Sequence, residues 1–163
     1  ILWCASFKVG KLKSKRWQYG HMFWVSMLCT CIIGFMKAHA AHACPWDMTH
    51  PTATGFIWDF SATAGHCFPG GHASTGFALV TGYFVYRLDQ TNRAWFYLFA
   101  GILLGFAMGW AQMMRGAHFI SHNLWTGWIC LAINFVVYMI TYKRHLRIAE
   151  RNSVTQMSPN MIK

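Results

Sequence analysis

The sequence predicts an all-α, polytopic membrane helix bundle, on three observations: its composition, its long apolar segments and the positions of its basic residues. Of the 163 residues, 55% are hydrophobic and 17% aromatic, whereas only 11% are charged. A soluble domain carries about 25% charged residues, so this chain has too few of them to cover a surface that faces water. We therefore expect a single membrane-embedded domain over residues 1–163.

Four uncharged apolar segments account for the predicted spans. Each approaches the length of about 20 residues that an α-helix needs to cross a bilayer. They are residues 22–36, lengthened by flanking residues such as 19–21, and then 71–86, 95–114 and 122–142. A basic loop at 6–21 precedes them, and the stretch 38–69 between the first two is irregular in pattern. The basic, polar tail from residue 143 is expected to fray into disorder.

The basic residues separate the two sides of the predicted membrane. With four spans, one side holds residues 6–21, 87–94 and 143–163, and these carry twelve of the fourteen Lys and Arg residues. The other side, residues 37–72 and 115–121, carries only Lys37 and Arg115. The positive-inside rule makes the first side cytoplasmic. Topology thus accounts for the net charge of +10, so we expect the lipid bilayer as a partner and no nucleic acid.

A turn-forming stretch, Pro69-Gly70-Gly71-His72, opens the second predicted span. Glycines let the backbone approach a ligand closely, and the N–H groups of a first helical turn can bind an anion. A histidine at this place can exchange a proton with that anion. The alternative is a turn that merely happens to end in histidine.

Further ionisable residues are predicted on the same outer face. Lys37 closes the first span, Arg115 and His118 lie in the link after the third, and His122 opens the fourth. Ionisable groups at membrane depth are costly, and they are usually functional. If both are helical, His118 and His122 share a face, and one ring can hold the other in a defined tautomer. The alternative is a set of satisfied polar groups at helix ends.

These residue types suit phosphoryl transfer. One histidine can attack phosphorus and a second can protonate the leaving oxygen. Lysine and arginine can balance the charge on the phosphate oxygens.

Three spaced motifs carry a family resemblance. They read Lys37, six residues, Cys44-Pro45; then Pro69-Gly70-Gly71-His72; then Ala111-Gln112, five residues, His118, three residues and His122. In order and spacing they resemble the three signatures of the type-2 phosphatidic acid phosphatase family, which shares its site with vanadium haloperoxidases. The similarity covers most of residues 37–142 and points to a membrane-bound bacterial branch.

The resemblance implies a metal-independent lipid phosphatase that needs no cofactor. His118 would be the nucleophile that forms a phosphohistidine, and His72 would be the general acid. Lys37 and the N–H groups of Gly70 and Gly71 would hold the phosphate. The substrate would be a lipid phosphate or diphosphate of the phosphatidate, polyprenyl diphosphate or lipid A phosphate class.

The resemblance also implies an architecture and a location. The family usually has six membrane helices, so the chain is expected to be a fragment that lacks the first two. The expected location is the bacterial inner (plasma) membrane, with the active site facing the periplasm or the exterior.

The motifs depart from the family pattern at three positions. Cys44 and Gln112 stand where the family has arginine, and His122 stands where an aspartate orients the nucleophilic histidine. Arg115, about one helical turn beyond Gln112, is our candidate substitute for a phosphate-binding arginine. A neutral imidazole at position 122 can accept the orienting hydrogen bond, but it supplies no negative charge. We therefore expect slower chemistry, compensation by an acid of the outer loop, or a variant site.

Several interpretations of the outer loop stay open. Asp47 or Asp59 could supply the missing charge, although Asp47 is more often a turn or cap residue in such a position. Cys44 and Cys67 could form a disulfide in an oxidising compartment. A metal site is disfavoured, because the spacing of the candidate ligands matches no recognised pattern; these are His39, His42, Cys44 and His50.

Other functions stay open beside the phosphatase. The protein could be a phosphotransferase that moves phosphate between lipids, or a catalytically impaired relative. A b-type haem protein is disfavoured, because no second histidine pair lies at the opposite face. In the third span, Gly101, Gly105 and Gly109 recur every four residues, and we interpret them as close helix packing.

Overall fold

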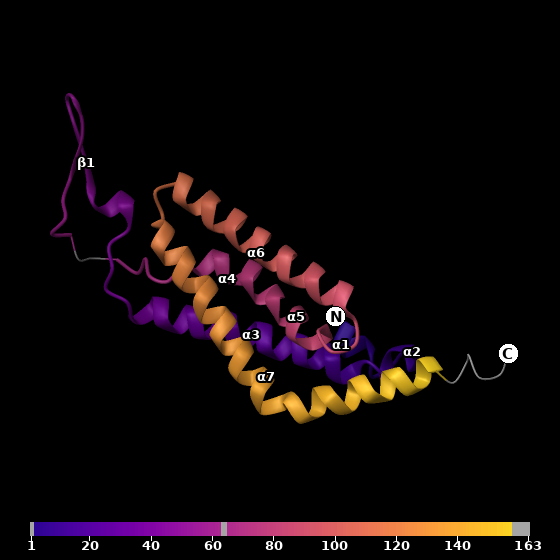
Figure 1. The fold of residues 1–163 in the computed structure, drawn as a ribbon. Coiled ribbons are helices and arrows are strands. Elements are labelled where there is room, and N and C mark those ends of the chain that lie inside the picture. The colour runs from indigo at the N-terminus through magenta and orange to yellow at the C-terminus, as the bar shows by residue number, and fades with distance from the viewer. Residues whose placement is uncertain (1, 63–64, 158–163) are drawn as a thin grey trace.

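Three long helices form the frame of the computed structural model, which describes residues 2–62 and 65–157. They are α3 (Arg16–His39), α6 (Thr91–Met114) and α7 (Ile120–Met157), shown in Figure 1. All of α3, all of α6 and the part of α7 from Ile120 to Val154 are long and apolar enough to cross a membrane. The chain fits an α-helical membrane bundle, in agreement with the predicted fold class.

The second predicted span is helical, but it is shorter than the other three and a 3-10 turn interrupts it. It consists of α4 (Gly71–Phe77), the 3-10 turn η2 (Ala78–Val80) and α5 (Thr81–Tyr86). At 1.5 Å per residue, these residues make a rod of about 24 Å, short of the hydrocarbon core of about 30 Å. Four apolar segments are thus helical where predicted, but only three of them, in the part of the chain that the structure describes, are long and apolar enough to span alone.

The α4–η2–α5 rod is the most enclosed part of the bundle and lies among α3, α6 and α7 (Figure 1). The 3-10 turn interrupts its regular hydrogen bonding, and the Ser26 hydroxyl of α3 donates to the Ala78 carbonyl there at 3.1 Å. A buried apolar cluster joins the rod to α3 and α7; its members are Cys29, Ile33, Ala73, Phe77, Ala78 and Cys130. This cluster holds the rod in place.

The glycine series of α6 allows the rod to approach closely, as predicted. A Cβ on Gly101 would lie 2.9 Å from Val80, and one on Gly105 would lie 2.5 Å from the Phe77 ring. On the next turn, a Cβ on Gly109 would lie 2.7 Å from the side chain of Asn123 in α7. Each distance is below what real Cβ atoms tolerate, so a larger side chain would force the helices apart.

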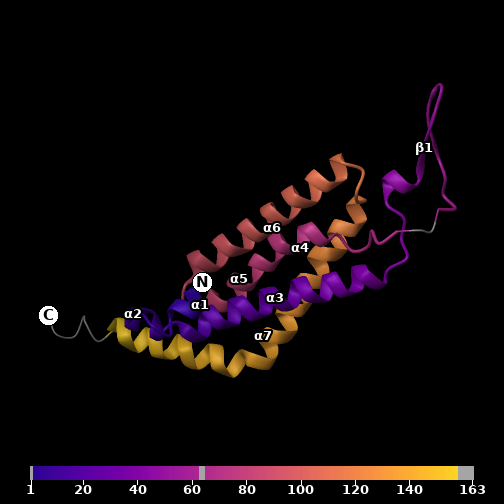
Figure 2. The same cartoon turned by 180° about the vertical axis from the view of Figure 1, so that it is seen from behind.

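The two polar ends depart from the predictions. The loop 6–21 is partly helical, because α2 (Gly10–Lys13) lies within it and α3 begins at Arg16; α1 (Leu2–Ala5) precedes it. The tail does not fray at residue 143, since α7 continues to Met157. Its residues are mostly good helix formers. In addition, His145 is buried against Trp17 of α3, with ring centroids 4.7 Å apart, so this part of α7 returns along the start of α3 (Figure 2).

The segment between α3 and α4 contains a hairpin that the sequence did not predict. Strands β1 (Thr49–Thr52) and β2 (Gly55–Trp58) pair antiparallel, with Thr49 opposite Trp58 and Thr52 opposite Gly55. A short 3-10 turn, η1 (Pro45–Asp47), precedes them. The hairpin projects from the end of the bundle at which α3 ends and α7 begins (Figures 1 and 2).

Candidate active site

The three motif segments meet at one end of the bundle. Lys37 lies in the last turn of α3, His72 in the first turn of α4, and His118 in the loop between α6 and α7. Figure 1 shows that the end of α3, the start of α4 and the loop between α6 and α7 lie at the end of the bundle from which the hairpin projects. The sequence prediction that they share one end is therefore consistent with the fold.

The lysine of the first motif lies beside the second motif. A Cβ on Gly71 would be 3.5 Å from the Cδ atom of Lys37, which is an ordinary van der Waals contact. The stem of Lys37 is half-buried and passes the N-terminal turn of α4. Its ammonium group therefore belongs to the same neighbourhood as the N–H groups of that turn.

The start of α7 fixes the glycine turn. The Gly70 N–H donates to the His122 carbonyl at 3.4 Å, and the Thr126 hydroxyl donates to the Gly70 carbonyl at 3.2 Å. The amide of Asn123 occupies the space that a side chain at position 70 would need. Gly70 thus directs its N–H to protein, whereas Gly71 is the first residue of α4, where N–H groups lack an intrahelical acceptor.

His118 and His122 come together, but not on one helical face. His118 precedes α7, and His122 lies in its first turn. Their ring centroids are 6.0 Å apart at an interplanar angle of 69°. Both are buried, and within the described residues the Nδ1 atom of each has no hydrogen-bond partner. The predicted hydrogen bond between the rings is absent from the contacts of the described chain.

The environment of His118 favours a neutral ring. Burial lowers the pKa of His118 to about 4, and the charges of Lys37, His122 and His72 act in the same direction. His118 therefore holds an unprotonated ring nitrogen at neutral pH, as a nucleophile requires. The same influence shows that His72 and Lys37 lie within electrostatic range of His118, although His72 itself is exposed.

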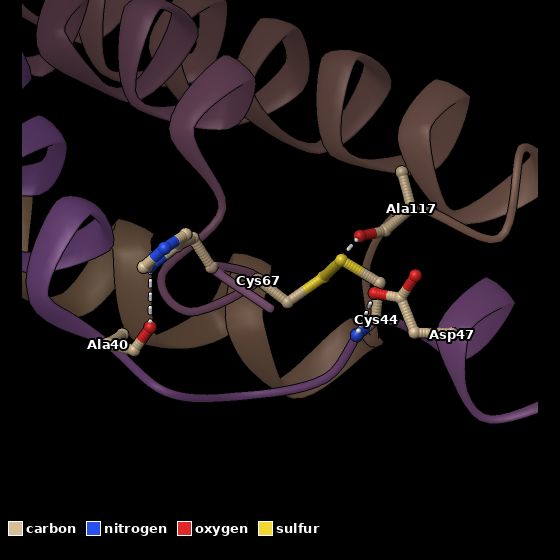
Figure 3. The surroundings of a disulfide bond; sticks show 6 residues. Ala40, Cys44, Asp47, Cys67 and Ala117 are labelled. Carbon is tan, nitrogen blue, oxygen red and sulfur yellow. Dashed lines mark hydrogen bonds between the residues drawn. A yellow bond between two sulfur atoms is a disulfide. The ribbon is translucent and has the colours of Figure 1, made fainter. Parts of the chain in front are cut away.

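A disulfide within the segment between α3 and α4 lies beside the loop of His118. Cys44 and Cys67 are bonded, with Cα atoms 5.2 Å apart, so the pairing that the sequence left open is formed (Figure 3). The Sγ atom of Cys67 lies 2.8 Å from the carbonyl oxygen of Ala117, the residue before His118. A disulfide sulfur carries no proton, so this is a close contact rather than a conventional hydrogen bond. The bridge thus contacts the loop of His118 at a point just before the second motif in the chain.

Backbone hydrogen bonds strengthen the same junction. The Trp46 N–H donates to the Gly116 carbonyl at 3.0 Å, and the Cys67 N–H donates to the His42 carbonyl at 3.0 Å. The ring of His66 is hydrogen-bonded to the Ala40 carbonyl at 2.8 Å (Figure 3). Segments on both sides of the hairpin are therefore fixed to the loop between α6 and α7.

The predicted substitutes for the missing family residues lie elsewhere. Arg115 is the exposed C-cap residue of α6, and no side-chain hydrogen bond or ion pair joins it to another described residue. The carboxylate of Asp47 accepts the Cys44 N–H at 3.1 Å, so Asp47 is a cap, as the sequence favoured. Asp59 accepts hydrogen bonds from Ser61 in the segment between α3 and α4, and these hydrogen bonds lower the pKa of its carboxyl group. Neither acid contacts His118 or His122 among the described contacts.

Sequence reasoning missed two residues of this site, Asn123 and Thr126. Both are buried polar residues in an otherwise apolar helix. Within the described part of the chain, neither polar atom of the Asn123 amide has a hydrogen-bond partner. Polar residues so close to His122 in an apolar span could have marked them as site residues. Their contact with Gly70 could not be predicted, because it involves a segment about fifty residues earlier in the chain.

Comparison with known proteins gives one result. A family model described as the PAP2 superfamily matches residues 18–146, a range that contains every site residue described above. No curated protein and no solved structure matches the chain.

Proposed function

The chain belongs to the PAP2 superfamily, and from this premise we propose that it hydrolyses a phosphate or diphosphate ester carried by a membrane lipid. Membership of the superfamily supports phosphatase-type activity on phosphate esters. The observation that carries the proposal further is the meeting of Lys37, the Gly71 turn and a neutral, buried His118 at one end of the bundle.

In the proposed first step, a ring nitrogen of His118 attacks phosphorus and the bond to the leaving oxygen breaks. His72 donates a proton to that oxygen as general acid. The product is a phosphohistidine on His118. In the second step, water attacks the phosphohistidine, His72 accepts its proton, and inorganic phosphate leaves. Atoms and protons balance over the cycle, and none of these steps calls for a metal or a cofactor.

Positive charge for the phosphate comes from two sources in this proposal. The ammonium group of Lys37 balances the charge on the phosphate oxygens, and the free N–H of Gly71 donates from the N-terminus of α4. Gly70 contributes mainly the close approach of the backbone, because its N–H is directed to His122. The exposed side chain of Arg115 would have to turn toward the site to bind the phosphate, so we assign it a minor role in phosphate binding.

His122 takes the orienting position behind His118. A neutral imidazole offers a hydrogen-bond acceptor but no charge to stabilise a protonated partner. We therefore expect turnover slower than that of a site with a carboxylate at position 122. The supporting observation is the 6.0 Å approach of the two rings.

An apolar groove supports a lipid substrate. It has a volume of about 350 Å³ and lies between the end of α6 and the start of α7, lined by Leu103, Phe106, Ala107, Trp110, Met113, Ile120 and Asn123. Asn123 also borders Gly70. A hydrocarbon chain in this groove would bring its phosphate toward the glycine turn.

Release of inorganic phosphate tests the proposal. The full-length protein in detergent is given phosphatidate, a polyprenyl diphosphate and lipid A, with and without a chelator. We expect phosphate release that withstands the chelator and is lost in His118→Ala, whereas His50→Ala, an exposed residue of the hairpin, is the matched control. Activity that persists in His118→Ala, or that depends on added metal, would contradict the mechanism.

A further inference from the structure

A sulfur and two imidazoles converge beside the glycine turn. The Cys67 sulfur and one ring nitrogen each from His118 and His122 all lie within 4.8 Å of one another, and all three residues are buried. Thiolate and imidazole are the donors that zinc prefers, and a site of three protein ligands leaves a fourth position for water. Among the described residues, this is the one group of three potential metal ligands that lie close enough to share an ion.

The oxidised protein cannot use this donor set. The Cys67 sulfur is bonded to Cys44, so it carries no thiolate charge with which to bind a metal. In contrast, the Nδ1 atoms of His118 and His122 are buried and have no hydrogen-bond partner within the described residues. Buried polar groups are normally paired, so these two atoms indicate that the pocket can accept a further ligand.

We propose that reduction of the Cys44–Cys67 disulfide turns this pocket into a zinc site formed by Cys67, His118 and His122. Two equivalents of a small thiol on that side of the membrane are oxidised to a disulfide while Cys44 and Cys67 each gain a hydrogen. The Cys67 thiol then loses its proton to solvent as its sulfur binds Zn²⁺, and the two neutral imidazoles each donate a lone pair.

The geometry requires only a small adjustment. Zn–N bonds of about 2.0 Å and Zn–S bonds of about 2.3 Å in a tetrahedron place neighbouring donors about 3.5 Å apart. The donors of this pocket, which lie within 4.8 Å of one another, must therefore approach by roughly 1 Å. Reduction frees the Cys67 side chain to rotate toward the rings, because its bond to Cys44 no longer fixes it.

The consequence is regulation of the proposed phosphatase, and this part rests on the proposed function. A zinc ion on His118 occupies the lone pair that would attack phosphorus. The reduced protein would therefore be inhibited by zinc, and the oxidised protein would resist it. The binding itself does not depend on what the site catalyses.

Metal binding is measured first, on the full-length chain in detergent. Four preparations are compared: oxidised wild type, wild type reduced with a phosphine that supplies no thiol ligand, Cys44→Ser and Cys67→Ser. Co²⁺ serves as the spectroscopic probe, because a thiolate ligand gives it a charge-transfer band, and Zn²⁺ competition then gives the affinity. Near-ultraviolet circular dichroism reports whether each preparation is folded.

We expect the band in reduced wild type and in Cys44→Ser, where Cys67 is free. Oxidised wild type and Cys67→Ser should lack it. Removal of a residue that only hydrogen-bonds to a metal ligand lowers metal affinity by about 10–100-fold. Removal of the thiolate ligand itself should therefore weaken Zn²⁺ binding by at least about 100-fold. Cys67→Ser is the matched control, because it also lacks the disulfide and keeps the free cysteines Cys4, Cys29, Cys31 and Cys130.

Two results would overturn the inference. One is equal Zn²⁺ affinity in Cys67→Ser and Cys44→Ser; the other is a folded, reduced wild type that binds no Zn²⁺. If Cys44→Ser does not fold, reduced wild type answers the question alone. Failure of the proposed function is distinguishable, since it would leave the Co²⁺ band intact while phosphate release is absent from every preparation.

Discussion

Replacement of Gly70 by alanine tests the contact between the second motif and α7. The backbone of Gly70, with φ −71° and ψ 96°, is open to any residue, so no conformational strain accompanies the change. The new methyl group would instead overlap the Oδ1 atom of Asn123 and lie 3.5 Å from the Thr126 hydroxyl. Overpacking of this kind costs about 1–3 kcal/mol. For a chain of this size, each kcal/mol lowers the melting temperature by about 2–4 °C.

The neighbouring glycine provides the control for stability. A Cβ on Gly71 meets only the Cδ atom of Lys37, at an unstrained 3.5 Å. We therefore expect Gly70→Ala to lower the melting temperature in detergent and Gly71→Ala to leave it unchanged or slightly raised. Phosphate release by Gly70→Ala should fall as well, because the methyl group displaces the start of α7 and with it His122.

A double-mutant cycle identifies the clashing group. Asn123→Ala removes the amide, so it should restore part of the stability that Gly70→Ala loses, with a coupling energy of about 0.5–3 kcal/mol. Equal melting temperatures for Gly70→Ala and Gly71→Ala, or no coupling with Asn123→Ala, would refute the proposed contact.

Three further predictions concern the histidines and the disulfide. The pKa of His118 is lowered to about 4 from 6.5. The unfolded chain therefore binds a proton at this histidine more readily than the folded protein does. As the pH drops from about 6.5 toward 4, the free energy of unfolding should decrease. Thermal melts of wild type and His118→Asn check this, and equal pH profiles would contradict it. His122→Asp should raise phosphate release by about tenfold or more, because its charge stabilises a protonated His118; His122→Asn is the uncharged control, and an equal gain there would argue against a role of charge. Loss of the disulfide in Cys44→Ser or Cys67→Ser should cost about 2–5 kcal/mol, seen as a lower melting temperature, whereas Cys31→Ser, at an exposed free cysteine, should melt like wild type.

The sequence was informative where the signal is local. The apolar runs placed α3, α6 and the first part of α7, because hydrophobicity along a helix is set by its own residues. The motif around His72 was located for a similar reason, since glycines before a helix indicate a turn wherever they occur. We predicted that the three motifs meet at one end from the alternation of four spans, of which three in the described chain are long and apolar enough to cross a membrane alone.

Features that depend on distant segments were not predictable in the same way. Local propensity permits α7 to continue beyond residue 143, and the contact of His145 with Trp17, more than a hundred residues earlier, holds this part of the helix against α3. The placement of Asn123 against Gly70 and Gly109 joins three segments whose proximity no local pattern records. The sequence left open whether His118 and His122 share one helical face; in the structure His118 lies in the loop after the turn at Gly116, which has φ 69°, and α7 begins only at Ile120.

The short α4–η2–α5 rod has a consequence for the order in which the protein assembles. Helices that can cross a bilayer alone insert first and associate afterwards. The α4–η2–α5 rod is too short to cross alone and contacts α3, α6 and α7. It would therefore dock between these three helices after they have inserted. His72 stands at its first turn. We therefore expect biogenesis to pass through an intermediate in which the three long helices are inserted but the protein is inactive. Docking of the rod would complete the fold and bring His72, the proposed general acid, to the site.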